Sequence, residues 1–316
     1  MFLHSCRHFL ICITVSFLCI CLAGCSFSFP EESKDSVSSA LPASSSFAVT
    51  FIDVGQGDAS LIQCDGRYML IDGGLPDQSQ KIYALLKKRN IAHLDYIICT
   101  HAHSDHVGGL AGALQIASCD QAFSNTLTYS SKTYTKFVKQ LQEHDVPLSI
   151  PNVGDVYSLG SASFQILGPT DREKTMDEND QSLILRIQYG STYFLFTGDA
   201  EQEEQQLLMY NSYDSLRANV LKAAHHGSSN GASAAWIKAV KPEITVISCG
   251  KNNEYGHPHE KTLDLLKNAG SSVYRTDLQG DITVTSDGSS VSASPTKNAD
   301  ADVWRPGEKN TDSESS

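Results

Sequence analysis

Four potential metal ligands lie within six consecutive residues of the chain. They are His101, His103, Asp105 and His106, in the pattern His-X-His-X-Asp-His. Imidazole and carboxylate groups are ordinary ligands of zinc and similar divalent cations. A loop between a strand and a helix projects such side chains into one pocket, so we expect His101 and His103 to bind one ion and Asp105 and His106 a second. A solvated loop with ordinary surface histidines is disfavoured, because three histidines beside an aspartate are uncommon in so short a stretch.

Two later segments end in further potential ligands. The apolar run 193–197 leads to Gly198 and Asp199, and the run 220–224 leads to His225 and His226. Taken alone, Asp199 is equally well explained as a helix N-cap, and the two histidines as structural residues. Together with the first cluster they suit a site that holds two ions about 3.5–4 Å apart. The sequence leaves open which of His225 and His226 is the ligand.

The elements that must position these residues follow from hydrophobic periodicity and turn signals. Strands are predicted at 47–54, 60–64, 68–72, 94–100, 164–167, 182–188, 193–197, 220–224, 244–249, 272–275 and 281–285. Helices are predicted at 80–89, 107–116, 132–143, 200–210, 232–240 and 260–269. Strands come first and then alternate with helices, which suits sheets covered by helices on their outer faces. The pattern is compatible with a four-layer αβ/βα sandwich but does not select it over other α/β arrangements.

Composition and charge limit the kind of partner. Hydrophobic residues make up 41% of the 316 residues and charged residues 19%, as in a soluble globular protein. The formal net charge of −12 gives no general attraction for nucleic acid. An anionic substrate held by metal ions remains compatible with this charge, since the cations act at the site itself. No stable protein partner is evident.

The N-terminal segment has the pattern of a secretory signal. An apolar run from Phe9 to Leu22 follows Arg7 and ends in Ala23-Gly24-Cys25, which resembles a bacterial lipobox with lipidation at Cys25. The alternative is an uncleaved N-terminal anchor, and in both cases the body faces outward from the cell membrane. We therefore expect a signal peptide (1–24), a Ser-rich tether (25–46), one hydrolase domain (47–291) and a disordered acidic tail (292–316).

Several motifs in order resemble the metallo-β-lactamase superfamily, and within it the extracytoplasmic hydrolase domain of the ComEC family of DNA-uptake competence proteins. The matching segments are Asp53-Val54-Gly55-Gln56-Gly57-Asp58-Ala59, Asp72-Gly73-Gly74, the His101–His106 cluster, Thr197-Gly198-Asp199, Ala224-His225-His226-Gly227-Ser228 and Tyr255-Gly256-His257-Pro258-His259. The resemblance covers nearly the whole body. It implies the four-layer αβ/βα fold and a site for two divalent cations, zinc or manganese.

The resemblance also implies a role for each site residue. His101 and His103 bind one metal, while Asp105 and His106 bind the other together with His226, and Asp199 bridges the two. Asp72 and Asp58 support the ligands from behind, although Asp72 is also explained as a turn residue before two glycines. The catalytic residues are Asp105, His225 and His257, of which the two histidines are candidates to hydrogen-bond a phosphate oxygen or to protonate a leaving group.

One feature departs from the superfamily pattern. A third-motif histidine is usual between the first cluster and the bridging aspartate, but His144 is the only histidine in that interval and reads as a surface residue. Asn179-Asp180-Gln181-Ser182 occupies the expected region. We therefore expect the first metal to be less fully liganded by the protein, with water or substrate completing its shell.

These expectations indicate a membrane-tethered, extracytoplasmic metallo-hydrolase. The leading interpretation is a phosphodiesterase or nuclease that acts on DNA. One alternative is a phosphodiesterase of the cell surface, as in phosphorylcholine esterases that act on teichoic acids. A non-enzyme alternative is a metal- or ligand-binding surface lipoprotein that retains the fold.

Overall fold

The computed structural model describes residues 47–171 and 177–309. The predicted signal peptide (1–24), the lipidation site at Cys25 and the tether (25–46) lie outside the described residues. Within the part of the chain that the structure describes, no helix has both the length and the apolar character needed to cross a membrane.

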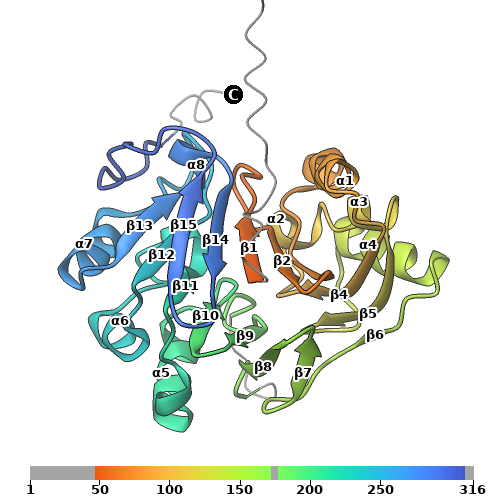
Figure 1. The fold of residues 1–316 in the computed structure, drawn as a ribbon, viewed down its shortest axis with the longest axis horizontal. Coiled ribbons are helices and arrows are strands. Elements are labelled where there is room, and N and C mark those ends of the chain that lie inside the picture. The colour runs from red at the N-terminus through yellow and green to blue at the C-terminus, as the bar shows by residue number, and fades with distance from the viewer. Residues whose placement is uncertain (1–46, 172–176, 310–316) are drawn as a thin grey trace, which may run out of the picture. The chain divides into compact units, whose positions relative to one another are not determined.

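Two sheets form the centre of the domain (Figure 1). The eight-stranded sheet has the order β15-β14-β1-β2-β3-β4-β5-β6. Its strands are β1 (Phe47–Phe51), β2 (Ser60–Cys64), β3 (Arg67–Ile71), β4 (His93–Cys99), β5 (Ser118–Ser124), β6 (Leu148–Ser149), β14 (Ile282–Ser286) and β15 (Val291–Pro295).

The seven-stranded sheet has the order β13-β12-β11-β10-β9-β8-β7. Its strands are β7 (Val156–Leu159), β8 (Ala162–Gly168), β9 (Ile184–Tyr189), β10 (Thr192–Phe196), β11 (Val220–Lys222), β12 (Ile244–Ile247) and β13 (Ser272–Arg275). Strands β10 to β13 run parallel to one another, so their carboxyl ends meet at one edge of the sheet.

Three apolar cores hold four layers together. The core between the sheets takes alternate residues from each, such as Phe47 and Phe51 from β1 and Phe194 and Phe196 from β10. Leu195, which points the other way, packs under the helices on the outer face of its sheet. This two-residue period is what a strand between two apolar layers requires. The predicted α/β class and the two-sheet αβ/βα sandwich are confirmed.

The helices lie on the outer faces of the two sheets (Figure 1). Helices α1 (Ser79–Lys88), α3 (Ala111–Leu114) and α4 (Lys132–Glu143) cover the eight-stranded sheet. Helices α5 (Gln202–Asn211), α6 (Ala234–Val240) and α7 (Glu260–Asn268) cover the other. A short helix α8 (Thr276–Gln279) follows β13.

The predicted helix 107–116 is instead two short helices, α2 (Ser104–Val107) and α3. Gly108 and Gly109 lie between them and allow a close backbone approach. A Cβ atom on Gly109 would lie 1.9 Å from the carbonyl oxygen of Gly73, and one on Gly108 would lie 2.4 Å from the nitrogen of Pro76. The histidine loop is thereby packed directly onto the turn that follows β3.

The C-terminal segment also departs from the expectation of a disordered tail from residue 292. Strand β15 pairs with β14 along its whole length. Farther on, Arg275 donates a hydrogen bond of 3.1 Å from Nη1 to the carbonyl oxygen of Val303, whose side chain is buried. Pairing and burial therefore order the chain beyond β14, and the predicted tail residues 310–316 lie outside the described residues.

Candidate metal centre

Four predicted ligands from both sheets converge at one point. Asp105 and His106 lie in α2 after β4, Asp199 follows β10, and His226 follows β11. One ligand atom from each lies within 4.8 Å of the others. His106 Nε2 is 3.1 Å from Asp199 Oδ2, and His226 Nε2 is 3.1 Å from Asp105 Oδ2 and 3.3 Å from Asp199 Oδ2. Asp199 Oδ2 therefore lies within reach of both histidines.

His101 and His103 face each other beside this cluster. His101 Nε2 lies 3.0 Å from His103 Nδ1, and the ring of His101 lies 4.1 Å from that of His106, centroid to centroid. Burial holds the pKa of His101 well below its usual range, so its imidazole is neutral, which is the form that binds a metal ion. The facing nitrogens form a second pair of donors next to the first cluster.

Carboxylates hold the ligand histidines from behind. Asp72 Oδ2 accepts a hydrogen bond of 2.9 Å from His106 Nδ1. The carbonyl oxygen of Ser248 accepts the corresponding bond of 3.0 Å from His226 Nδ1, and Asp58 Oδ1 lies 3.2 Å from the same nitrogen as a charge partner. Because each ring keeps a proton on Nδ1, Nε2 is the nitrogen that faces the cluster and would give its lone pair to a bound cation. Asp72 therefore supports its histidine through a hydrogen bond, whereas Asp58 supports His226 through its charge alone.

Burial disfavours a proton on His106 and His226, but the carboxylates around them outweigh it. Asp199 contributes most to raising the pKa of both rings well above the usual range. The same contacts hold the pKa of Asp199 well below its usual range, against the effect of burial. The carboxylates of the cluster thus favour positive charge at this position, as is expected of a cation site.

His226, and not His225, belongs to the ligand cluster. His225 Nδ1 is 2.8 Å from Glu201 Oε1, and its Nε2 is 4.0 Å from Asp199 Oδ2. Both histidines have positive φ angles, 47° and 53°. Two consecutive non-glycine residues in this region are strained, and such strain is found mainly at functional sites. The turn lets two adjacent histidines serve different positions at the same site.

A small cavity opens over the cluster. Its volume is about 200 Å³, and it is lined by Gln56, His103, Asp105, Asn179, Asp199, His225, His226, Tyr255 and His257. The ring of Tyr255 stacks on that of His257, with centroids 5.4 Å apart. Burial, followed by His226 and His225, lowers the pKa of His257 to about 3. His257 is therefore neutral at pH 7 and can donate a hydrogen bond, but it carries no extra proton for a leaving group.

Sequence analysis did not identify three further residues near the site: Lys222, Glu178 and Tyr129. Lys222, in β11, is buried and pairs with Asp58, and its Nζ lies 3.9 Å from Asp199 Oδ1. Glu178 Oε2 lies 2.7 Å from His103 Nε2 and also accepts a hydrogen bond from Tyr129. Lys222 could have been found from the sequence, because a lysine inside the apolar run 220–224 indicates a buried charge that needs a partner.

The donor set fits a pair of divalent cations. Nitrogen and carboxylate oxygen donors are mixed, as suits zinc or manganese. Asp199 Oδ1 and Asn179 Oδ1 are both buried and make no hydrogen bond to any of the described residues. Buried polar atoms without partners are rare in folded proteins and call for an explanation, such as an ion. The ligand roles of the individual residues remain predictions.

Comparison with known proteins agrees with this geometry. Residues 52–251 match the model of the metallo-beta-lactamase superfamily. The chain is 31% identical over 257 residues to ComE operon protein 3 of Bacillus subtilis (strain 168), covering 76% of this chain and 33% of that protein. It is 30% identical to competence protein ComA of Neisseria gonorrhoeae, covering 74% of this chain and 31% of that protein. The chain thus spans about a third of the length of these curated relatives, and they confirm the resemblance to competence proteins.

Solved structures share the fold. The crystal structure of CmlA, a diiron beta-hydroxylase from Streptomyces venezuelae, aligns with a TM-score of 0.50 at 13% identity, covering 77% of this chain and 54% of that chain. At that identity the likeness concerns the fold alone. The superfamily match covers more than half of the sequence and includes the histidine loop, Asp199 and His226. The chain therefore belongs to the metallo-beta-lactamase superfamily.

Proposed function

We propose that this protein is a phosphodiesterase that acts on DNA outside the cell, tethered to the membrane by lipid at Cys25. The observation that carries the hydrolase proposal is the convergence of Asp105, His106, Asp199 and His226 from two sheets beneath one cavity. A pair of divalent cations bound there would supply a water nucleophile at neutral pH and offset charge on the phosphoryl oxygens.

The protein's own groups orient the substrate and move the proton. His225 donates through Nδ1 to Glu201 and lines the cavity, so its Nε2 can take the proton released by the attacking water and pass it to the leaving oxygen. His257, with its pKa lowered to about 3, serves instead as a neutral hydrogen-bond donor to a phosphoryl oxygen. We assign the acid role to His225 and a binding role to His257.

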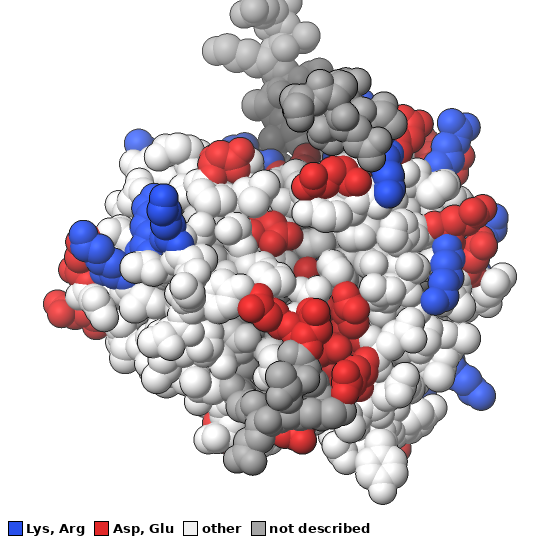
Figure 2. Space-filling model, turned by 180° about the vertical axis from the view of Figure 1, so that it is seen from behind, with Lys and Arg blue, Asp and Glu red and all other residues white. Residues whose placement is uncertain are grey.

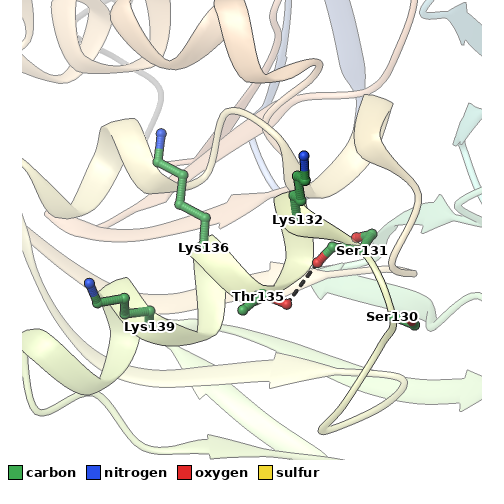
Figure 3. Close-up of a pocket in the computed structure, with 6 residues that line it drawn as sticks. All are labelled: Ser130, Ser131, Lys132, Thr135, Lys136 and Lys139. Atoms are coloured by element: carbon green, nitrogen blue, oxygen red, sulfur yellow. Dashed lines mark hydrogen bonds between the residues drawn. The ribbon is translucent and has the colours of Figure 1, made fainter.

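A row of lysines supports an extended anionic substrate. Lys132, Lys136 and Lys139 line a shallow hollow of about 510 Å³ together with Ser130, Ser131 and Thr135 (Figure 3). The spacing of four and three residues places the lysines on one face of α4. Ser104 Oγ of α2 lies 3.3 Å from Thr133 Oγ1 of α4, so the helix that carries the lysines contacts the helix that carries Asp105 and His106. We therefore expect a strand whose phosphodiester lies over the cations to extend toward these lysines.

The charge of the protein favours local rather than broad contact with DNA. Figure 2 shows Asp and Glu side chains gathered in the middle of one face, with Lys and Arg side chains nearer its edges. The net charge is −12. We therefore expect affinity for DNA to depend on the bound cations and on the lysines of α4.

A cell-surface phosphodiester is the second candidate, favoured by Tyr255. This side chain is half exposed and lines the cavity together with the carboxylates of Asp105 and Asp199. An aromatic face beside carboxylates suits a quaternary ammonium group. Phosphorylcholine carries such a group next to its phosphodiester.

Turnover by the purified full-length chain separates these functions. Plasmid DNA, bis-p-nitrophenyl phosphate and p-nitrophenyl phosphorylcholine are compared with zinc or manganese added. We expect all cleavage to be lost in His106→Ala, and DNA cleavage alone to fall in Lys132→Glu/Lys136→Glu. Lys238→Glu on α6 is the matched surface control. Cleavage of the choline ester without cleavage of DNA would favour the second candidate, and no cleavage of any substrate would favour a binding protein.

The tether is tested in cells. We expect Cys25→Ala to abolish incorporation of a labelled fatty acid and to release the protein from the membrane fraction. Unchanged labelling would exclude Cys25 as the anchor, whatever the result of the turnover experiments.

A further inference from the structure

The segment that replaces the missing third histidine lies against the first pair of histidines. Ser182 Oγ is 3.4 Å from His101 Nδ1 and accepts a hydrogen bond of 3.1 Å from the backbone nitrogen of Asp199. A turn joins Ser182 to Asn179, whose carbonyl oxygen accepts a hydrogen bond of 3.0 Å from the nitrogen of Ser182. This turn therefore lies where it can reach both His101 and the bridging carboxylate.

Asn179 presents an unsatisfied oxygen at this place. Its side chain lines the cavity with His103 and Asp199. Asn179 Nδ2 lies 3.4 Å from Glu201 Oε1. Because a carboxylate accepts hydrogen bonds and does not donate them, this contact sets which end of the amide is nitrogen. Asn179 Oδ1 is the other end, and it is buried with no hydrogen bond to residues 47–171 or 177–309.

We propose that Asn179 Oδ1 is a further protein ligand of the cation held by His101 Nε2 and His103 Nδ1, in place of the missing histidine. This inference rests on the proposed two-cation site. Glu178 is not that ligand in this arrangement, because it contacts His103 through Nε2, the nitrogen that faces away from His101. Glu178 instead fixes the ring so that Nδ1 points inward, as carboxylates do behind other metal-binding histidines.

The exchange of histidine for asparagine changes which cation the site prefers. An amide oxygen is a hard, uncharged donor, whereas imidazole is a borderline donor that suits zinc. The site formed by His101, His103 and Asn179 should therefore bind manganese relatively better than a three-histidine site does. Its partner site, with Asp105, His106 and His226, lacks this difference.

Metal binding, measured without any substrate, tests the proposal. Full-length wild type and variants are titrated with Mn²⁺ or Zn²⁺ by calorimetry, and the bound ions are counted after gel filtration. We expect two ions in wild type, and at least a 10-fold weaker first site in Asn179→Ala. Asn179→His should move the preference of that site at least 10-fold toward zinc. Gln181→Ala, in the same turn, is the matched control and should bind both ions as wild type does.

Each other outcome would overturn the inference. These outcomes are one ion in wild type, two ions at wild-type affinity in Asn179→Ala, or an equal loss in Gln181→Ala. If Asn179→Ala does not fold, as judged by circular dichroism, Asn179→His tests the proposal instead. A first site whose preference does not move toward zinc in that variant would then refute it. Because the readout is metal binding, a protein that binds two ions through Asn179 yet cleaves nothing would refute the hydrolase proposal and leave this one intact.

Discussion

The orientation of His106 depends on a single buried carboxylate, and Asp72→Asn tests that dependence. Asp72 Oδ1 accepts a hydrogen bond of 2.8 Å from the nitrogen of Thr100, and Oδ2 accepts bonds of 2.7 Å from Thr100 Oγ1 and 2.9 Å from His106 Nδ1. Asparagine has the same size and tolerates the φ angle of 56° at this position. The substitution therefore changes the hydrogen-bonding character of the site while the backbone keeps its path.

The substitution should put the proton of His106 on the wrong nitrogen. The amide oxygen must remain opposite the backbone nitrogen of Thr100, so the amide nitrogen replaces Oδ2 and donates to His106 Nδ1. The ring proton then moves to Nε2, which lies 3.1 Å from Asp199 Oδ2 in the ligand cluster. A protonated Nε2 cannot bind a cation. Losing such a supporting carboxylate typically costs 10–100-fold in metal affinity, or about 1.4–2.7 kcal/mol.

Competition with a chelator measures this loss directly. The chain is dialysed against graded chelator with manganese or zinc, and the retained metal is counted. Asp120→Asn is the matched control, because Asp120 also contacts a histidine, with His93 Nε2 at 3.1 Å, but on the surface. We expect the control to bind metal as wild type does. A folded Asp72→Asn protein with wild-type metal affinity would refute the argument from the tautomer.

Three further predictions concern stability, measured by urea denaturation. Burial raises the pKa of Glu204 from 4.5 to about 7. Since the folded state then favours the protonated side chain, the free energy of unfolding falls as the pH rises from 4.5 to about 7. Glu204→Gln should therefore be more stable than wild type by about 3 kcal/mol at pH 8 but not at pH 4. Lys222→Met leaves Asp58 buried without its cation and should cost about 3–5 kcal/mol, a loss that Lys222→Met/Asp58→Asn should largely recover if the pairing is the cause. Phe194→Ala, in the core between the sheets, should cost about 3–5 kcal/mol, and a loss below 1 kcal/mol would mean that the layers repack.

Elements with strong local patterns could be predicted from the sequence. The amphipathic helix Lys132–Glu143 and the strand Ser60–Cys64 have the predicted bounds. The histidine loop was recognisable because four donors are adjacent in the chain. In each case the information lies within about a dozen residues, so periodicity or composition alone is sufficient.

Features that depend on distant partners could not be predicted. Strand β15 is polar and lies at a sheet edge, so only its pairing with β14 identifies it. Glu178 meets His103 across 75 residues of sequence, and it has no local pattern that distinguishes it from other acidic loop residues. The choice between His225 and His226 depends on two left-handed φ angles that the neighbouring sequence does not encode unambiguously.

The donors of the cluster come from opposite layers of the sandwich. A cation bound by them would therefore link the two sheets. Phe51 of one sheet stacks on Phe196 of the other, with ring centroids 5.8 Å apart, and Phe196 lies three residues before Asp199. A shift of one sheet relative to the other at this ring pair would therefore change the distances between the donor atoms of the cluster. Because the donors Asp105 and His106 follow one sheet and Asp199 and His226 the other, neither layer alone contains the whole donor set. We therefore expect substitutions in the core between the sheets to affect metal binding.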